Sequence, residues 1–495
     1  MSPSSLVAAA RTRLQRAPRE GERFLDRPYA SVQLLLLAAA GLLVFGVLMA
    51  VSTTIAAANQ ADGSGTGGIW TQAVKEGLFI ALGLPIFWLA MRTSPRTYRI
   101  LAYPLMIIGV VALIAVLIPG IGFGVYGARR WIDLGPLQLQ PSEFAKVGIL
   151  LWGGDLLARK QQLGTLRRAR HLFLPLVPGF AFVAALVMLE PDLGTTCCYM
   201  LILLGLLWMI GMPLRYFAVI VAAVAGAVTL LAVTEPYRLA RLTSFLHPLK
   251  NASGSGYHAA ESLYALGSGG LFGVGLGEGT SKYWVPNANS DFVFAIIGEE
   301  LGLLGAAAVL ALFALFAYAG MRVARRSADP FVRLVAGAAT IWLCGQAVIN
   351  IGYVTALLPV TGIPLPFISA GGTSLLASFL VLGMLVSFAR HEAPAVSAAR
   401  RDERTGERSR IQRWLRIPVP RPYQPPKRRP RAAPARKAAP RSAPARTAAK
   451  RDQPSRTTAK VAAPRLGPQY PKPRAAPPHR APLRATGTDG RRRSR

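Results

Sequence analysis

The chain has 495 residues, of which 52% are hydrophobic and only 16% charged. This balance argues against a soluble globular enzyme, whose surface needs more charge. The formal net charge is +34, and the 105 residues after Arg390 contribute 29 basic and only 6 acidic side chains to it. Most of the excess positive charge therefore belongs to a C-terminal tail.

The N-terminal segment, residues 1–30, is basic, with six arginines and no long apolar run. The apolar run that begins at Ser31 has the wrong spacing and length for a cleaved signal peptide. We therefore interpret it as an uncleaved membrane anchor preceded by a cytoplasmic segment.

Apolar runs near the ~20 residues that cross a bilayer recur along the chain. We expect ten of them to form transmembrane helices, and hence an all-α integral membrane protein. The runs lie at 31–52, 73–91, 98–118, 142–158, 172–189, 195–212, 216–234, 291–321, 333–357 and 373–389.

The connections between these runs differ in basic charge. Lysines and arginines concentrate in the N-terminal segment and in the connections after each even-numbered run, whereas three of the five other connections contain neither. Because basic connections stay in the cytoplasm, we expect both termini there and a large loop, 235–290, outside between helices 7 and 8. The exceptions are Arg129, Arg130, Arg238, Arg241, Lys250 and Lys282.

The outside loop 235–290 is too long to be a passive connection and is rich in glycine from Gly254 to Gly279. Its glycines do not have the offsets of a dinucleotide-binding turn, and no strand precedes them. We expect close packing of backbone on backbone instead.

Ionisable residues at membrane level are costly, so each is a functional candidate. Glu143 and Lys146 lie three residues apart on one helix face, as either a satisfied structural pair or a substrate site. Glu299 and Glu300 diverge by about 100° on a helix, so we expect structural roles with separate partners. Asp291 begins the eighth run, where a carboxylate is either a helix cap or a functional group.

An outside loop places two cations, Arg129 and Arg130, beside Trp131. One interpretation is an aromatic belt residue with two headgroup anchors. The other is a site for an anionic ligand such as a lipid phosphate or diphosphate, which would explain arginines kept outside against the charge bias.

Four stretches together resemble the SEDS family of multi-span peptidoglycan polymerases of shape, elongation and division, and resemble its division members most. The similarity extends over roughly residues 30–390, outside the tail. The stretches are GARRWIDLGPLQLQPSEFAK (127–146), EPDLGT (190–195), GSGGLFGVGLGEGTSKYWVPNANSDFVFAIIGEELGLLG (267–305) and NIGYVTALLPVTGIPLPFISAGGTS (350–374).

The resemblance implies a glycosyltransferase that polymerises lipid II into glycan strands on the outer face of the cytoplasmic membrane, at the division septum. It implies Asp291 as the general base for the attacking sugar hydroxyl. A diphosphate leaving group needs charge stabilisation. The resemblance leaves room for a divalent cation such as Mg²⁺ or Mn²⁺ in this role, but the sequence shows no cluster of metal ligands that would hold it. The implied substrate-binding residues are Arg129, Arg130, Trp131, Glu143, Lys146 and Lys282.

Two positions depart from the family pattern. Asn289 stands where relatives usually have histidine, and Gln138 stands where some division members have arginine. The alternatives left open are a lipid II flippase with Glu143 and Lys146 along its path, an elongation polymerase, and a scaffold whose spans merely anchor it. The resemblance also implies a class B penicillin-binding protein as the crosslinking partner.

The tail, residues 391–495, is rich in proline, alanine and arginine and has too few large apolar residues for a core, so we expect it to be disordered. Anionic membrane lipid is its expected contact, with the acidic C-terminal peptide of the division protein FtsZ as a second partner and nucleic acid ranked below both. The three cysteines, Cys197, Cys198 and Cys344, lie in apolar runs, and we expect them to be buried and unpaired.

Overall fold

The computed structural model describes residues 24–60, 66–125, 128–133, 135, 138–165, 173–233, 247–252, 254, 256–406 and 415–425. The chain divides into two compact units, Met1–Pro426 and Lys427–Arg495, and every described residue belongs to the first. The tail beyond Pro426 lies outside the described residues.

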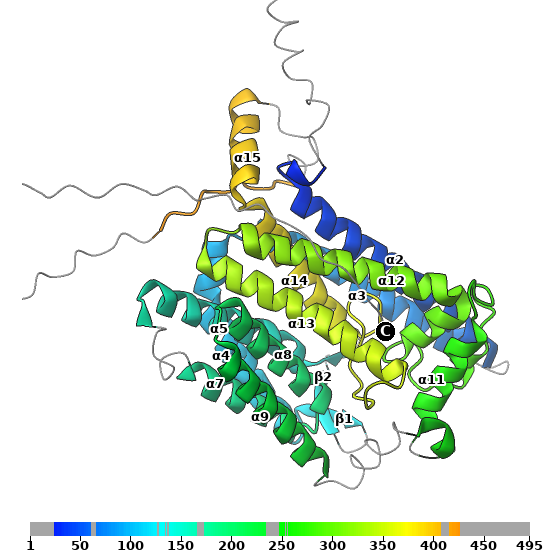
Figure 1. The fold of residues 1–495 in the computed structure, drawn as a ribbon. Helices are drawn as coiled ribbons and strands as arrows, with labels where there is room; N and C mark the ends of the chain where they lie inside the picture. Colours follow the sequence, from blue (N-terminus) through cyan, green and yellow to red (C-terminus); the bar gives the residue numbers. More distant parts are fainter. Residues whose placement is uncertain are drawn as a thin grey trace, which may run out of the picture. The chain divides into compact units, whose positions relative to one another are not determined.

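Long helices dominate the described part of the chain (Figure 1), and each predicted apolar run overlaps one of them. Six contain stretches long and apolar enough to cross a membrane, in α2, α3, α4, α12, α13 and α14. The apolar stretches of α7, α8 and α9 are shorter, and α5 carries several charges. The bounds are α2 Ala30–Gln60, α3 Thr66–Arg92, α4 Pro95–Leu117, α5 Pro141–Gln162, α7 Leu176–Leu189, α8 Leu193–Met209, α9 Leu214–Val233, α12 Val293–Arg326, α13 Pro330–Val354 and α14 Thr373–Arg390.

Helix starts follow local sequence signals. Ser94 caps α4 by accepting a hydrogen bond from the Thr97 amide, and Pro95 occupies the first turn. Asp329 and Pro330 repeat this arrangement at α13. The helices then pack in pairs, α3 with α14, α4 with α5, and α13 with both α8 and α12. Nearly all of α14 is buried, so it is a central helix of the unit.

The connection between α4 and α5 departs from the all-α expectation, which is wrong for this segment. It forms a three-stranded antiparallel sheet of β1 (Gly122–Val125), β2 (Ala128–Asp133) and β3 (Gln138–Leu139), in the order β1-β2-β3. Gly135 takes a positive φ in the turn after β2, and its amide donates to the Asp133 carboxylate. The sheet places Arg129, Arg130 and Trp131 on one strand.

Helix α12 is broken at Gly302, where φ is 66° and ψ is −164°. The break frees backbone groups on both sides, and the glycine-rich loop before α12 pairs with them. Val274 and Gly275 donate to the carbonyl oxygens of Glu299 and Glu300, and the amides beyond the break donate to those of Gly270 and Leu271. A Cβ on Gly273 would lie 2.1 Å from the Glu300 carbonyl oxygen, so the loop and helix approach as closely as the sequence analysis expected.

The rest of the long connection contains two short 3-10 turns, η3 (Pro248–Asn251) and η4 (Ser281–Tyr283), and one helix, α11 (Tyr257–Ser268). Helix α11 packs against α12. This loop region therefore has its own structure, and it positions the residues that lead to Asp291.

The compact unit extends past residue 390, where the sequence analysis placed the boundary. Helix α15 (Ala393–Thr405) starts with Pro394 in its first turn and ends at Gly406 in the left-handed conformation. In residues 415–425 a turn at 415–416 precedes a stretch without regular secondary structure, and the side chains of Leu415 and Ile417 pack on the core. Residues 391–495 were predicted to be disordered because they have too few large apolar residues for a core, whereas Ala393–Thr405 form a helix.

Candidate active site

Asp291 lies just before α12, whose N-cap is Phe292, so it is not the capping residue itself. Its side chain is half-buried. Its carbonyl oxygen accepts a hydrogen bond from the Asn350 side-chain amide at 2.9 Å and lies 2.9 Å from the Tyr353 hydroxyl. Both partners belong to α13, so a buried helix fixes the backbone that carries the carboxylate.

The connection between α13 and α14 packs beside this carboxylate. A Cβ on Gly362 would lie 3.5 Å from the Asp291 Oδ2 atom, which places the loop backbone next to the carboxylate. The loop is bonded to the same segment as Asp291: Ala370 donates to the Asn289 carbonyl oxygen at 2.9 Å, and the Ser369 hydroxyl donates to that of Ser290 at 2.5 Å. The loop therefore forms a fixed wall beside Asp291.

The same loop reaches the first turn of α8 on its other side. A Cβ on Gly194 would lie 2.7 Å from the Thr361 carbonyl oxygen, so only glycine permits this approach. Gln346 donates to the Pro364 carbonyl oxygen at 2.8 Å and accepts from the Trp342 indole at 3.0 Å. The loop thus connects the Asp291 region with the EPDLGT segment, which the chain places about 100 residues earlier.

Glu143 and Lys146 are buried together in α5, as their spacing predicted. The Lys146 Nζ atom lies 2.8 Å from each carboxylate oxygen of Glu143 and 5.2 Å from the centre of the Trp342 ring. The ammonium is thus neutralised by its neighbour and covered by an aromatic face. This geometry agrees with the interpretation as a satisfied pair.

The residues of β2 alternate between the two faces of the sheet. Arg129 is exposed, and Trp131 pairs across the strands with Phe123. Arg130 points the other way: its Nε atom donates to the Glu190 carbonyl oxygen at 3.1 Å and its terminal nitrogen donates to that of Pro191 at 2.5 Å. The structure therefore brings Arg130 to the EPDLGT segment and leaves Arg129 on the solvent side.

Lys282 has a different environment from the other predicted cations. Its Nζ atom lies 3.0 Å from the Glu300 carboxylate and also donates to the Ser52 hydroxyl at 3.1 Å and the Gly277 carbonyl oxygen at 2.6 Å. Its side chain is 1% exposed. Glu299 instead accepts from the Thr280 amide at 2.9 Å, so the prediction of separate partners for the two glutamates is confirmed.

Two carboxylates of the EPDLGT segment, Glu190 and Asp192, were not among the predicted site residues. Asp192 caps α8 through the Thr195 amide and accepts from Gln140 at 3.1 Å. Glu190 is buried, and neither carboxylate oxygen has a hydrogen-bond partner among the described residues. Burial, with a smaller contribution from the Asp192 charge and opposed by Arg130, raises the pKa of Glu190 to about 8. The place of this segment among the four stretches that carry the family resemblance was the signal that could have identified these two carboxylates.

The raised pKa of Glu190 predicts pH-dependent stability. Between its ordinary pKa of 4.5 and about 8, the folded chain holds a proton that the unfolded chain has lost, so stability falls as the pH rises through this window. Glu190→Gln should flatten the decline in melting temperature between pH 5 and pH 9. The exposed Glu278 provides the control, because Glu278→Gln should keep the wild-type decline. An equal decline in the Glu190→Gln protein would contradict the assignment.

Within the described ranges, no three histidine, cysteine, aspartate or glutamate side chains gather as metal ligands. The divalent cation that the resemblance allows therefore has no protein cage among these residues, and no step below depends on it. The three cysteines are free thiols, as expected, and Cys198 is buried, whereas Cys197 and Cys344 are only half-buried, so the expectation of full burial is wrong for these two.

Comparison with known proteins identifies the family of the chain. Residues 32–393 match the family model FTSW_RODA_SPOVE, described as cell cycle protein. Over 406 residues the chain is 44% identical to the probable peptidoglycan glycosyltransferase FtsW of Mycobacterium tuberculosis, covering 82% of this chain and 75% of the relative. It is 37% identical over 322 residues to stage V sporulation protein E of Bacillus subtilis, covering 64% and 87% of the two chains.

Solved structures agree with this result. A chain from a study of how a peptidoglycan synthase complex coordinates polymerization and crosslinking superposes with a TM-score of 0.58 at 26% identity, covering 72% of this chain and 96% of that one. The rod shape determining protein RodA of Thermus thermophilus gives a TM-score of 0.51 at 27% identity, with 72% and 96% covered.

Proposed function

Because the chain belongs to the FtsW/RodA/SpoVE family of cell cycle proteins, we propose that it is a peptidoglycan glycosyltransferase that builds septal cell wall during cell division. The observation that carries the proposal is the match of the whole helical region to this family, with relatives named FtsW. Its substrate is lipid II, a disaccharide-pentapeptide on a polyprenyl diphosphate, and its location is the cytoplasmic membrane at the septum.

In this proposal Asp291 is the general base. The 4-hydroxyl oxygen of the acceptor sugar attacks C1 of the donor sugar while its proton moves to the Asp291 carboxylate. The bond between C1 and the diphosphate oxygen breaks, and the electron pair leaves with the diphosphate. The half-buried carboxylate is held by its backbone against α13, so it keeps its position while remaining accessible to a sugar hydroxyl.

Cations stabilise the departing diphosphate in the same proposal. Arg129 is exposed on β2, and Arg130 is tied to the backbone at Glu190. Trp131 beside them offers an aromatic face to a sugar or a lipid. Lys146 and Lys282 are less suited to this role, because each is buried against a glutamate.

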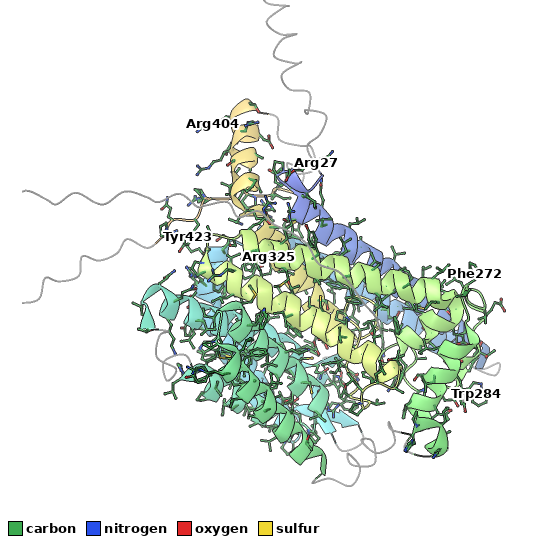
Figure 2. The ribbon with its side chains drawn as sticks, viewed as in Figure 1. Arg27, Phe272, Trp284, Arg325, Arg404 and Tyr423 are labelled. Atoms are coloured by element: carbon green, nitrogen blue, oxygen red, sulfur yellow. The ribbon has the colours of Figure 1, made fainter. Side chains whose placement is uncertain are left out.

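The ten-span arrangement with both termini in the cytoplasm belongs to the proposal. Figure 2 shows Arg27, Arg325 and Arg404 at one end of the helices, and Phe272 and Trp284 at the other. This separation is the charge bias expected of a cytoplasmic and an outer end.

Sidedness can be tested with single cysteines in an otherwise cysteine-free chain. In intact cells, cysteines at Asn251 and Thr361 should react with a membrane-impermeant thiol reagent, because both positions are assigned to the outside. A cysteine at Thr165 should react only after the cells are opened. Labelling at Thr165 in intact cells would reverse the assigned orientation.

A class B penicillin-binding protein is the proposed partner. The solved relative in a peptidoglycan synthase complex supports it, because that complex combines polymerization with crosslinking. Polymerisation of lipid II with and without this partner tests whether the activity depends on it.

The direct test is to incubate the purified chain with lipid II, alone and with its penicillin-binding partner, and to separate the products on a gel. Polymer ladders are expected. Transport of lipid II across vesicle membranes without any polymer would instead support the flippase alternative. The buried, mutually neutralised pair of Glu143 and Lys146 favours the polymerase over a flippase, since a transport path would need groups able to exchange partners.

The basic tail is proposed to contact anionic lipid and the acidic FtsZ peptide. Since the compact unit ends at Pro426, the tail should be removed after that residue rather than near residue 390. The truncated protein should polymerise lipid II normally in vitro but should concentrate less at the septum in cells. Loss of polymer synthesis by the purified truncated protein would show that the tail belongs to the catalytic unit.

A further inference from the structure

Two cavities adjoin at the end of the helices where α2 begins and where α3 and α14 end. The first, about 310 Å³, is mainly apolar, and Leu36, Val386, Ala399 and Ile417 are among its lining residues. The second, about 480 Å³, is lined by Arg400, Glu403, Pro418, Val419, Pro420 and Arg421. Residues 418–420 line both cavities, so a single molecule could occupy the two together.

The wall between the cavities is a fixed part of the fold. Residues 415–421, which we call the strap, are held at two points. The Trp88 indole donates to the Leu415 carbonyl oxygen at 3.1 Å, and Arg390 donates to that of Pro418 at 2.6 Å. Arg390 also donates to the Met91 carbonyl oxygen at 2.9 Å, which joins the strap to the ends of α3 and α14.

The cavities lie at a membrane boundary. The candidate spans of α2, α3 and α14 begin or end at Ala30, Arg92 and Arg390, and the apolar cavity is lined by residues from the same ends. At this depth an apolar space faces acyl chains while a cationic space faces headgroups. The apolar cavity lies beside the spans and the basic cavity lies beside α15. The two cavities therefore match the step from acyl chains to headgroups.

The charge of the second cavity suits a phosphate. Arg400 and Arg421 are both exposed, and among the described residues neither makes a hydrogen bond or ion pair. Glu403 is the single acidic residue in its lining, which leaves a net positive charge. Arginine binds phosphate through two parallel N–H donors, so two guanidinium groups can hold one phosphate diester.

We propose that the two cavities form one binding site for an anionic phospholipid of the leaflet at this end of the helices. The phosphate lies between Arg400 and Arg421, and an acyl chain enters the apolar cavity beneath the strap. This site goes beyond the proposed polymerase function, and it is separate from the diffuse attraction of the tail for lipid.

The site can be tested by native mass spectrometry of the full-length protein with added phosphatidylglycerol. We expect Arg400→Gln/Arg421→Gln to weaken the first binding event roughly 25-fold, at about fivefold for each arginine near an anionic lipid. Arg401→Gln/Arg404→Gln removes the same charge from exposed positions of α15 outside both cavities. This double variant should bind the first lipid with nearly wild-type affinity. Ala399→Phe, which fills the apolar cavity without changing charge, should also weaken it.

Four results would overturn the proposal. Equal weakening by the two arginine pairs would show diffuse attraction. Equal binding of the zwitterionic phosphatidylcholine would show that the site does not select an anionic lipid. Unaltered binding by the Ala399→Phe protein would show that the apolar cavity takes no part. Displacement of the lipid by millimolar inorganic phosphate would identify free phosphate as the ligand. Size-exclusion profiles matching the wild type establish that each variant is folded.

Discussion

Asp291→Asn should reduce lipid II polymerisation by about 10²–10⁴-fold while leaving the protein folded. Asparagine keeps the shape of the side chain and most of its hydrogen bonding, but it cannot accept the proton of the attacking hydroxyl. The bonds that fix this segment use the carbonyl oxygen of Asp291, not its carboxylate, so they survive the substitution. Gel analysis of the polymer and the melting temperature, measured on the same preparation, check both parts of the prediction.

The matched control is Asp133→Asn, which removes an exposed carboxylate from β2. Its polymerase activity should stay within a few-fold of wild type. Lipid II binding by the Asp291→Asn protein should also persist, because the diphosphate is held by other groups. If the Asp291→Asn protein still makes polymer, Asp291 has no part in proton transfer, and the base must be sought elsewhere.

The helices could be predicted because the relevant information is local. Each long apolar run must bury its backbone polar groups within one helix, whatever its neighbours are. Short runs with charges, such as α5, are harder to assign as spans from composition alone, since Glu143 and Lys146 become tolerable only when they neutralise each other. The spacing of three residues nevertheless predicted that these two would meet.

The features that sequence reasoning missed depend on tertiary contacts. The strands β1 and β2 are too short and too rich in glycine and arginine to show an alternating pattern. The break in α12 exists because a distant loop supplies partners for the backbone around Gly302. The burial of Glu190 depends on how the sheet, with Arg130, folds over the start of α8. None of these contacts leaves a periodic signal.

Lys282 shows the same limit, because the family resemblance implied it as a ligand for the diphosphate while its contacts could not be predicted. Asp291 could be assigned by resemblance to a family motif. Lys282 instead has two partners distant in the sequence, Glu300 on α12, 18 residues away, and Ser52 on α2, 230 residues away. The structure gives Lys282 a second possible role, as the cation that joins the glycine-rich loop to both helices. The two roles predict different outcomes for one substitution.

Lys282→Met should destabilise the protein by about 3–5 kcal/mol, because it leaves the Glu300 carboxylate buried without its counter-charge. The Lys282→Met/Glu300→Leu double variant should recover most of that loss, since apolar replacement of a whole buried ion pair is often close to neutral. Lys75→Met, at an exposed position on α3, should have little effect. Thermal unfolding in detergent, monitored alongside lipid II binding, separates the two roles. Normal stability with weakened lipid II binding in the Lys282→Met protein would identify Lys282 as a diphosphate ligand, and the ion pair with Glu300 would then be dispensable for the fold.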